Sequence, residues 1–157
     1  MATILLSSHE GHSSLRVKIA LVGCVKTKRP SASRAEDLYT SPLFRALREF
    51  AIKNADAWYI LSAEYGLLRP NQVVEPYERT LNKMKKPERA EWGNRVQAQL
   101  SASLPPTADV IFLAGTRYRE ALVPFLRRSG HAVSIPLEGL PLGRQLQRLR
   151  ELAEVRR

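Results

Sequence analysis

The chain has 157 residues, of which 44% are hydrophobic and 25% are charged, and this composition fits one domain with its own core and excludes long disorder. The single cysteine, Cys24, excludes an intrachain disulfide. The apolar cluster at 4–6 is too short for a signal peptide, and no run approaches the ~18 apolar residues of a membrane span. We therefore expect a cytoplasmic protein outside the membrane. The net charge of +10 favours a polyanionic partner, either nucleic acid or a nucleotide.

The first forty residues predict a tail, a strand and a loop. Residues 1–14 are serine-rich and lack periodicity, so we expect a flexible tail ahead of a single domain over 15–157. The near-continuous apolar run 17–25 is typical of a central parallel strand. A long basic loop follows over 26–40, and Ser41 has the residue type of a helix N-cap.

Strands and helices alternate along the rest of the chain. With the first one included, the predicted strands are 17–25, 57–62, 109–114 and 131–136. The predicted helices are 42–54, 87–104, 117–129 and 141–155. Pro42 suits the first position of the first helix, and Gly130 suits the end of the third. The last helix carries its leucines on one stripe, at Leu142, Leu146, Leu149 and Leu152.

This alternation predicts an α/β domain built as a three-layer sandwich around a mostly parallel sheet of about four strands. The segment 63–86 is longer than an ordinary connection, and long loops in compact domains are usually functional. Ligands of open parallel sheets bind outside the carboxyl ends of the strands. We therefore expect a site among the residues that follow the predicted strands.

The loop after the first strand is basic. Lys26, Lys28, Arg29 and Arg34 either contact phosphates or form a solvated surface loop. The loop lacks the G-x-x-x-x-G-K-[ST] spacing of a phosphate-binding loop, and the chain lacks G-x-G-x-x-G. A nucleotide triphosphatase and a dinucleotide enzyme are therefore disfavoured.

A carboxylate, Glu64, directly follows the second strand beside Tyr65 and Gly66. There it could stabilise a developing cation or activate water, or it could form a surface ion pair with Arg69. Tyr65 and Tyr77 could stack on a base, or one of them could pack beneath the loop.

The turn after the third strand, at Gly115, opens the next helix. Its amides together with Arg117 could bind an anion at the helix N-terminus, and Arg119 adds a second cation. Tyr118 either lines the pocket or packs on the helix.

Other candidate chemistries are weaker. His9 and His12 stand in the tail without a third ligand, so a metal site is disfavoured, and we expect neither metal nor redox cofactor. Cys24 suits a buried strand-end thiol better than a nucleophile. Ser62 lacks the G-x-S-x-G elbow of a serine hydrolase.

Two motif groups resemble known families. Residues 61–70, LSAEYGLLRP, followed by Glu75-Pro76-Tyr77, resemble the core motif of the YaaA family of peroxide-stress proteins, which is like L-S-G-x-Y-G-L-L-R-P and then x-P-Y. VGCVKTK at 22–28, DLYTSPLF at 37–44 and the turn at 114–118 are similar to a family of short bacterial proteins known as a domain of unknown function. The second resemblance covers nearly all of 17–150.

The first resemblance implies an α/β fold with a positively charged cleft and a role in binding and protecting DNA. The wider group also looks similar to the α/β fold of uracil-DNA glycosylases, which implies a pocket for a base or nucleotide at the strand ends. Ala63 and Glu64 stand where the YaaA pattern commonly has glycine and a variable residue, and the difference supplies a carboxylate.

These features together predict a nucleobase N-glycosidase that acts on DNA or a nucleotide. Glu64 is the expected catalytic carboxylate, and Tyr65 or Tyr77 would stack on the flipped base. The expected phosphate contacts are Lys28, Arg69, Arg117 and Arg119. The rest of the expected pocket is Cys24, Lys26, Ser62, Gly66, Gly115 and Tyr118. The alternatives are a non-catalytic DNA-binding module of YaaA type and a hydrolase of small nucleotides or nucleosides.

Overall fold

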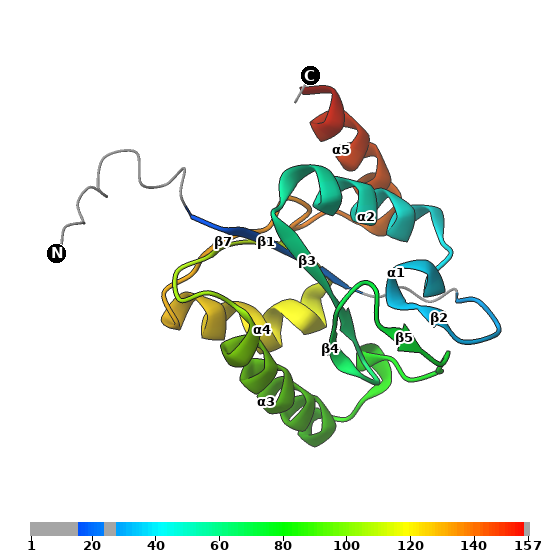
Figure 1. Ribbon diagram of the computed structural model, residues 1–157, viewed down its shortest axis with the longest axis vertical. Coiled ribbons are helices and arrows are strands. Elements are labelled where there is room, and N and C mark those ends of the chain that lie inside the picture. The colour runs from blue at the N-terminus through cyan, green and yellow to red at the C-terminus, as the bar shows by residue number, and fades with distance from the viewer. Residues whose placement is uncertain (1–15, 24–27, 156–157) are drawn as a thin grey trace, which may run out of the picture.

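A five-stranded, mostly parallel sheet forms the centre of the computed structural model, which describes residues 16–23 and 28–155 (Figure 1). The strand order is β4-β3-β1-β6-β7, and within this sheet β4 alone runs antiparallel to its neighbour. The strands are β1 (Lys18–Gly23), β3 (Ala57–Ser62), β4 (Gly66–Leu68), β6 (Asp109–Leu113) and β7 (Ala132–Ser134). The α/β class and the four parallel strands expected from the sequence are confirmed.

The middle strand, β1, is buried on both faces. Ile19 and Leu21 belong to one apolar core, and Ala20 and Val22 belong to the other. β1 pairs with β3 on one side and with β6 on the other. A strand in this position must be apolar at successive residues, which explains the continuous run in the sequence.

Helices cover both faces of the sheet. α3 (Lys86–Ser103) and α4 (Thr116–Arg128) pack on the face of Leu21, through residues such as Trp92 and Leu122. The opposite face is covered by the segments α1 (Ala35–Leu38), α2 (Pro42–Asn54) and α5 (Leu142–Val155). The three-layer arrangement expected from the sequence is thus present.

The long segment 63–86, expected to be a loop, contains a fifth strand of the sheet. β4 returns antiparallel along β3, with Ser62 opposite Gly66 and Ile60 opposite Leu68. The reversal is tight because Gly66 has a φ of 76°, a left-handed conformation that glycine adopts without strain. The expectation of four strands was therefore short by one, because a three-residue strand is too brief to show periodicity.

The two long loops also pair with each other, which corrects their description as loops alone. β2 (Ser33–Arg34) and β5 (Val73–Val74) form a small antiparallel sheet, and η3 (Leu81–Lys83) follows as a short 3₁₀ helix. Backbone bonds extend this contact, since the N–H of Glu36 donates to the carbonyl of Pro70 at 2.9 Å. The loops that follow β1 and β3 are therefore one connected structure.

The expected helix ends are confirmed to within one residue. Ser41 caps α2, because its Oγ accepts a hydrogen bond from the N–H of Phe44 at 3.1 Å, and Pro42 is the first residue of the helix. Gly130 follows α4 with a φ of 98°. The leucine stripe of α5 is only partly buried: Leu149 is 4% exposed, whereas Leu142 is 69% exposed.

None of the helices in the described ranges has the length and apolar character needed to cross a membrane. The tail expected over 1–14 lies outside the described residues.

Replacing Gly66 by alanine should destabilise the fold. An alanine Cβ would stand 2.5 Å from Oε1 of Gln99, which accepts the N–H of Leu67 at 3.0 Å, and φ would remain left-handed. Left-handed backbone and a disturbed hydrogen bond each cost ~1 kcal/mol, so Gly66→Ala should lower the free energy of unfolding by about 2 kcal/mol in urea titrations.

Gly143→Ala is the matched control, because a Cβ at this position in α5 meets nothing within 4 Å. Alanine is the better helix former, so this variant should be unchanged or more stable by up to ~1 kcal/mol. Equal stability of the two variants would show that the conformation of Gly66 does not constrain the turn.

Candidate functional site

The carboxyl ends of β1, β3 and β6 lie along one edge of the sheet, as their parallel pairing requires. The chain passes from β1 to β3 on one side and later to β6 on the other, so the strand order reverses at β1. The crevice outside such a reversal point is where open α/β sheets bind ligands. Gly23 sits at this point, and a Cβ there would lie 2.7 Å from the Cβ of Ala114. Cys24 and Lys26, two of the predicted site residues, lie outside the described residues.

The buried residue Ser62 organises the end of β3. It has no exposed surface, and its Oγ accepts hydrogen bonds from the N–H groups of Glu64 at 3.2 Å and Tyr65 at 3.0 Å. The same hydroxyl donates to the Tyr77 hydroxyl at 2.9 Å, and the Ser62 carbonyl accepts from Nε1 of Trp92 at 2.9 Å. Ser62 therefore joins the turn at 63–65 to the loop and to α3, and it lies beneath the surface of the site.

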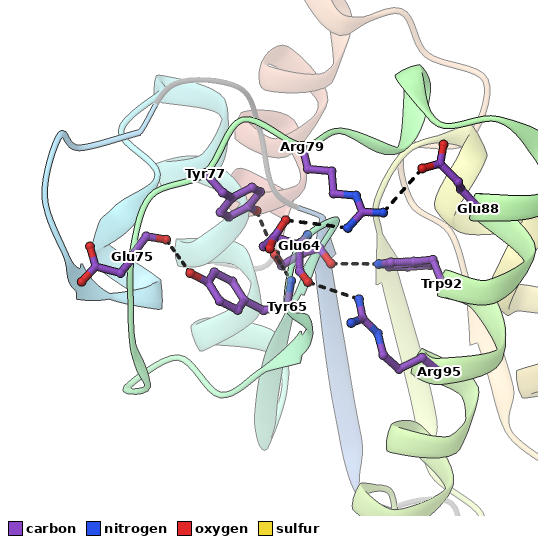
Figure 2. Close-up of polar contacts among 9 residues, drawn as sticks. Glu64, Tyr65, Glu75, Tyr77, Arg79, Glu88, Trp92 and Arg95 are labelled. Carbon is purple, nitrogen blue, oxygen red and sulfur yellow. Dashed lines mark hydrogen bonds and ion pairs between the residues drawn. The ribbon is translucent and has the colours of Figure 1, made fainter.

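Three tyrosines pack together above this turn. The hydroxyls of Tyr39 and Tyr77 are 2.6 Å apart, and the ring of Tyr65 meets that of Tyr77 edge-on, with centroids 5.5 Å apart. The Tyr65 hydroxyl donates to the carbonyl of Glu75 at 3.0 Å, and Nζ of Lys28 lies 4.6 Å from the centroid of the Tyr77 ring. Tyr77 is thus held at its hydroxyl and at its ring, and Tyr65 lies between Tyr77 and the backbone of Glu75 (Figure 2).

The carboxylate of Glu64 lies at the surface, with 41% of the side chain exposed. Its Oε1 is 3.9 Å from Nη1 of Arg79, whose Nη2 is 3.7 Å from Oε2 of Glu88. Arg95 donates to the backbone carbonyl of Glu64 at 3.2 Å (Figure 2). The surface partner of the carboxylate is therefore Arg79 and not Arg69. Exposed ion pairs of this length contribute at most ~1 kcal/mol, so a ligand can displace Arg79 from Glu64 at little cost.

The turn after β6 supplies a second group of predicted residues. Gly115 is the N-cap of α4, and Arg119 folds back to donate to the carbonyl of Ala114 at 3.2 Å and to Oγ1 of Thr116 at 3.0 Å. Arg117 is half-buried, and its Nη1 lies 3.3 Å from Oε1 of Glu120. This group is therefore a basic helix start at the reversal point of the sheet.

An aromatic contact connects the two groups. Tyr118 of α4 packs edge-on against Trp92 of α3, with ring centroids 5.4 Å apart, and Trp92 in turn holds the Ser62 carbonyl. Arg69 is not brought to either group. β4 runs antiparallel to β3 and so leads away from the carboxyl edge of the sheet. Leu68, at its end, is already opposite Ile60, and Arg69 comes after it. Gly66 lies at the turn itself, beneath Gln99.

Several residues at this site were not found by sequence reasoning. Arg79, Glu88 and Arg95 surround Glu64, and Trp92 and Tyr39 support the turn. Arg79 was detectable as a cation within the long loop, whereas α3 carries no motif that marks Trp92 or Arg95. Within the described residues, no group of three or more histidine, cysteine, aspartate or glutamate side chains is placed to hold a metal ion.

The fold and this edge define a basic α/β protein with a mostly parallel sheet and a polar, tyrosine-rich site at the strand ends. The chain belongs to a family of unknown function, DUF6884, whose family model matches residues 19–151. It is also 30% identical over 145 residues to the "Uncharacterized protein YfjM" of Bacillus subtilis (strain 168), which covers 87% of this chain and 95% of that protein. The expected membership in a family of unknown function is confirmed.

Removing the Ser62 hydroxyl should destabilise the site. Ser62→Ala removes the hydroxyl that accepts from the amides of Glu64 and Tyr65 and donates to the Tyr77 hydroxyl, so we expect a loss of about 2 kcal/mol in the free energy of unfolding.

Ser33→Ala is the matched control, because the Ser33 hydroxyl is buried without a hydrogen-bond partner among the described residues. Its removal should be neutral or stabilising in the same urea titration. A loss as large in Ser33→Ala as in Ser62→Ala would refute the role given to the Ser62 hydrogen bonds.

Proposed function

We propose that this protein binds nucleic acid or a nucleotide at the carboxyl edge of its sheet and hydrolyses an N-glycosidic bond there, with Glu64 as the catalytic carboxylate. The observation that carries the proposal is the position of Glu64: its exposed carboxylate stands at the end of a central parallel strand, on a turn fixed from below by Ser62. A ligand in the expected place for this fold would meet that carboxylate.

The reaction needs few groups. The bond between the sugar C1′ and the base nitrogen breaks, the base leaves with the electron pair, and the oxygen of a water molecule bonds to C1′. The transition state resembles an oxocarbenium ion, which a carboxylate stabilises directly or by taking the proton from the attacking water. The proton released ends on the base, so the products are a free base and a sugar hydroxyl.

Cations around Glu64 suit a phosphate-bearing substrate. Arg79 and Arg95 reach the Glu64 turn from the loop and from α3, and Arg117 lies at the start of α4. The chain as a whole carries a net charge of +10. Phosphates bound by these residues would hold the sugar at the strand ends, in keeping with the resemblance to YaaA proteins and to uracil-DNA-glycosylase-like domains.

Tyr65 is the better placed of the two predicted stacking residues. Tyr77 is committed to Ser62 through its hydroxyl and to Lys28 through its ring, whereas Tyr65 contacts the protein through its hydroxyl and one T-shaped ring contact. A base that enters beside Glu64 would therefore stack on Tyr65, a contact worth ~1–3 kcal/mol for single-stranded nucleic acid.

A second candidate function is DNA binding without catalysis. The observation in its favour is the ion-pair chain Glu64–Arg79–Glu88, in which the carboxylate serves to hold an arginine at the surface. The affinity of such a module for DNA would fall with salt. A plot of log K against the logarithm of the salt concentration would have a slope of about −0.9 for each phosphate contacted.

Glu64→Gln should abolish base release while leaving binding intact. The amide keeps the size of the side chain but cannot stabilise a cation, so we expect release to fall by ~100-fold or more and the affinity for DNA to be unchanged or higher. The measurement is mass spectrometry of free bases from normal, deaminated, oxidised and phage-type modified DNA and from nucleotides.

Glu78→Gln is the control, because Glu78 is an exposed carboxylate of the same loop for which no ion pair is found among the described residues. Equal base release by the wild type and by Glu64→Gln would refute the catalytic role. Salt-dependent DNA binding with no base release from any substrate would favour the second candidate.

A further inference from the structure

On the face of the sheet covered by α2 and α5, the two helices diverge and leave a cavity of about 380 Å³ between them. This volume is within the range of ~300–1,000 Å³ that is typical of small-molecule sites. Apolar side chains line much of it, and they come from both helices: Ala46, Phe50, Leu146 and Leu149. The cavity lies apart from the Glu64 turn, so it is independent of the function proposed above.

The rim of this cavity is positively charged. Arg45 and Lys53 of α2 and Arg150 of α5 line it, against a single carboxylate, Glu49. None of these four side chains forms a hydrogen bond or ion pair with another residue in the described part of the chain. Three cations beside an apolar floor are therefore available to a ligand that has an anionic group next to an apolar body.

The apolar surface continues beyond the cavity. Leu142 stands one turn before Leu146 on the same stripe of α5 and is 69% exposed. An occupant longer than the cavity can extend along this stripe, which favours an elongated apolar body over a compact one.

We propose that the cavity between α2 and α5 binds an amphiphilic monoanion, with a medium-length alkyl chain on Phe50, Leu146 and Leu149 and its carboxylate-like head at the cationic rim, beside Arg150. A phosphate backbone has no apolar body to fill the floor, so the cavity differs in chemistry from the nucleic-acid site. A second copy of the chain placed by two-fold symmetry would bring the same cations face to face, which opposes association through this surface.

Dodecanoate is the ligand that tests the proposal. Dodecyltrimethylammonium has the same chain with the opposite charge, and octanoate has the same head group on a shorter chain. All three are used below their critical micelle concentrations. Dodecanoate should bind saturably and shift the amide NMR signals of α2 and α5. Octanoate should bind at least tenfold more weakly, because each buried methylene contributes about fourfold in affinity. The cationic probe should bind at least fivefold more weakly than dodecanoate.

Two variants of α5 form a matched pair. Arg150→Glu should weaken dodecanoate binding about fivefold, whereas Arg148→Glu, which makes the same charge change at an exposed position outside the cavity, should leave it within about twofold. Ala46→Trp should block binding by filling the floor, and circular dichroism checks that each variant is folded.

Absence of dodecanoate binding would overturn the proposal, as would equal binding of the cationic probe or equal weakening by Arg148→Glu and Arg150→Glu. Shifts confined to other elements would overturn it too. If the signals of α2 and α5 change with protein concentration and dodecanoate does not bind, a second copy occupies the groove and the proposal is wrong.

Discussion

The candidate site depends on hydrogen bonds to two polar groups of one buried residue, the hydroxyl and the carbonyl of Ser62. Ser62 is fully enclosed, yet it brings a hydroxyl and a carbonyl into the core, and each such group costs ~1–3 kcal/mol if it lacks a partner. The amides of the 63–65 turn, the hydroxyl of Tyr77 and the indole of Trp92 supply those partners. They come from three segments of the chain, so the same bonds that satisfy Ser62 also fix the turn on which Glu64 stands.

The arginines near Glu64 complement this arrangement. Near Glu64, Arg79 is shared between two carboxylates and Arg95 binds a backbone carbonyl. Arginines held by weak, exposed contacts remain available to an incoming anion, since they exchange one partner for another. The cluster therefore combines a rigid floor of buried hydrogen bonds with a replaceable surface of ion pairs.

The sequence was sufficient to predict the parallel strands and the long helices, because both leave a local signature. β1 is buried on both faces and is apolar from Ile19 onward, and α2 is capped by Ser41 and begins at Pro42, residue types that favour a helix start. The short strands could not be found in this way. β2 and β5 have two residues each, and their pairing of Ser33 with Val74 joins positions distant in the chain.

The same distinction applies to the site. Glu64, Tyr65 and Tyr77 were identifiable because they belong to one loop after one strand. Three other contacts depend on the tertiary structure, because they are set by how the loop folds back and where α3 lies. They join Glu64 to Arg79, Ser62 to Trp92 and Tyr77 to Tyr39. The partial exposure of the α5 stripe has the same origin, since it depends on where α5 lies against the rest of the fold.

The side chain of Gln99 has a consequence for the edge of the sheet. β4 is an edge strand, and the open backbone groups of such a strand are a template on which another chain can add a strand and begin to aggregate. Gln99 reaches from α3 and occupies the N–H of Leu67 on this edge, and β4 itself is only three residues long. One backbone donor of a strand of only three residues is thereby occupied, which makes β4 a poor template for a further strand.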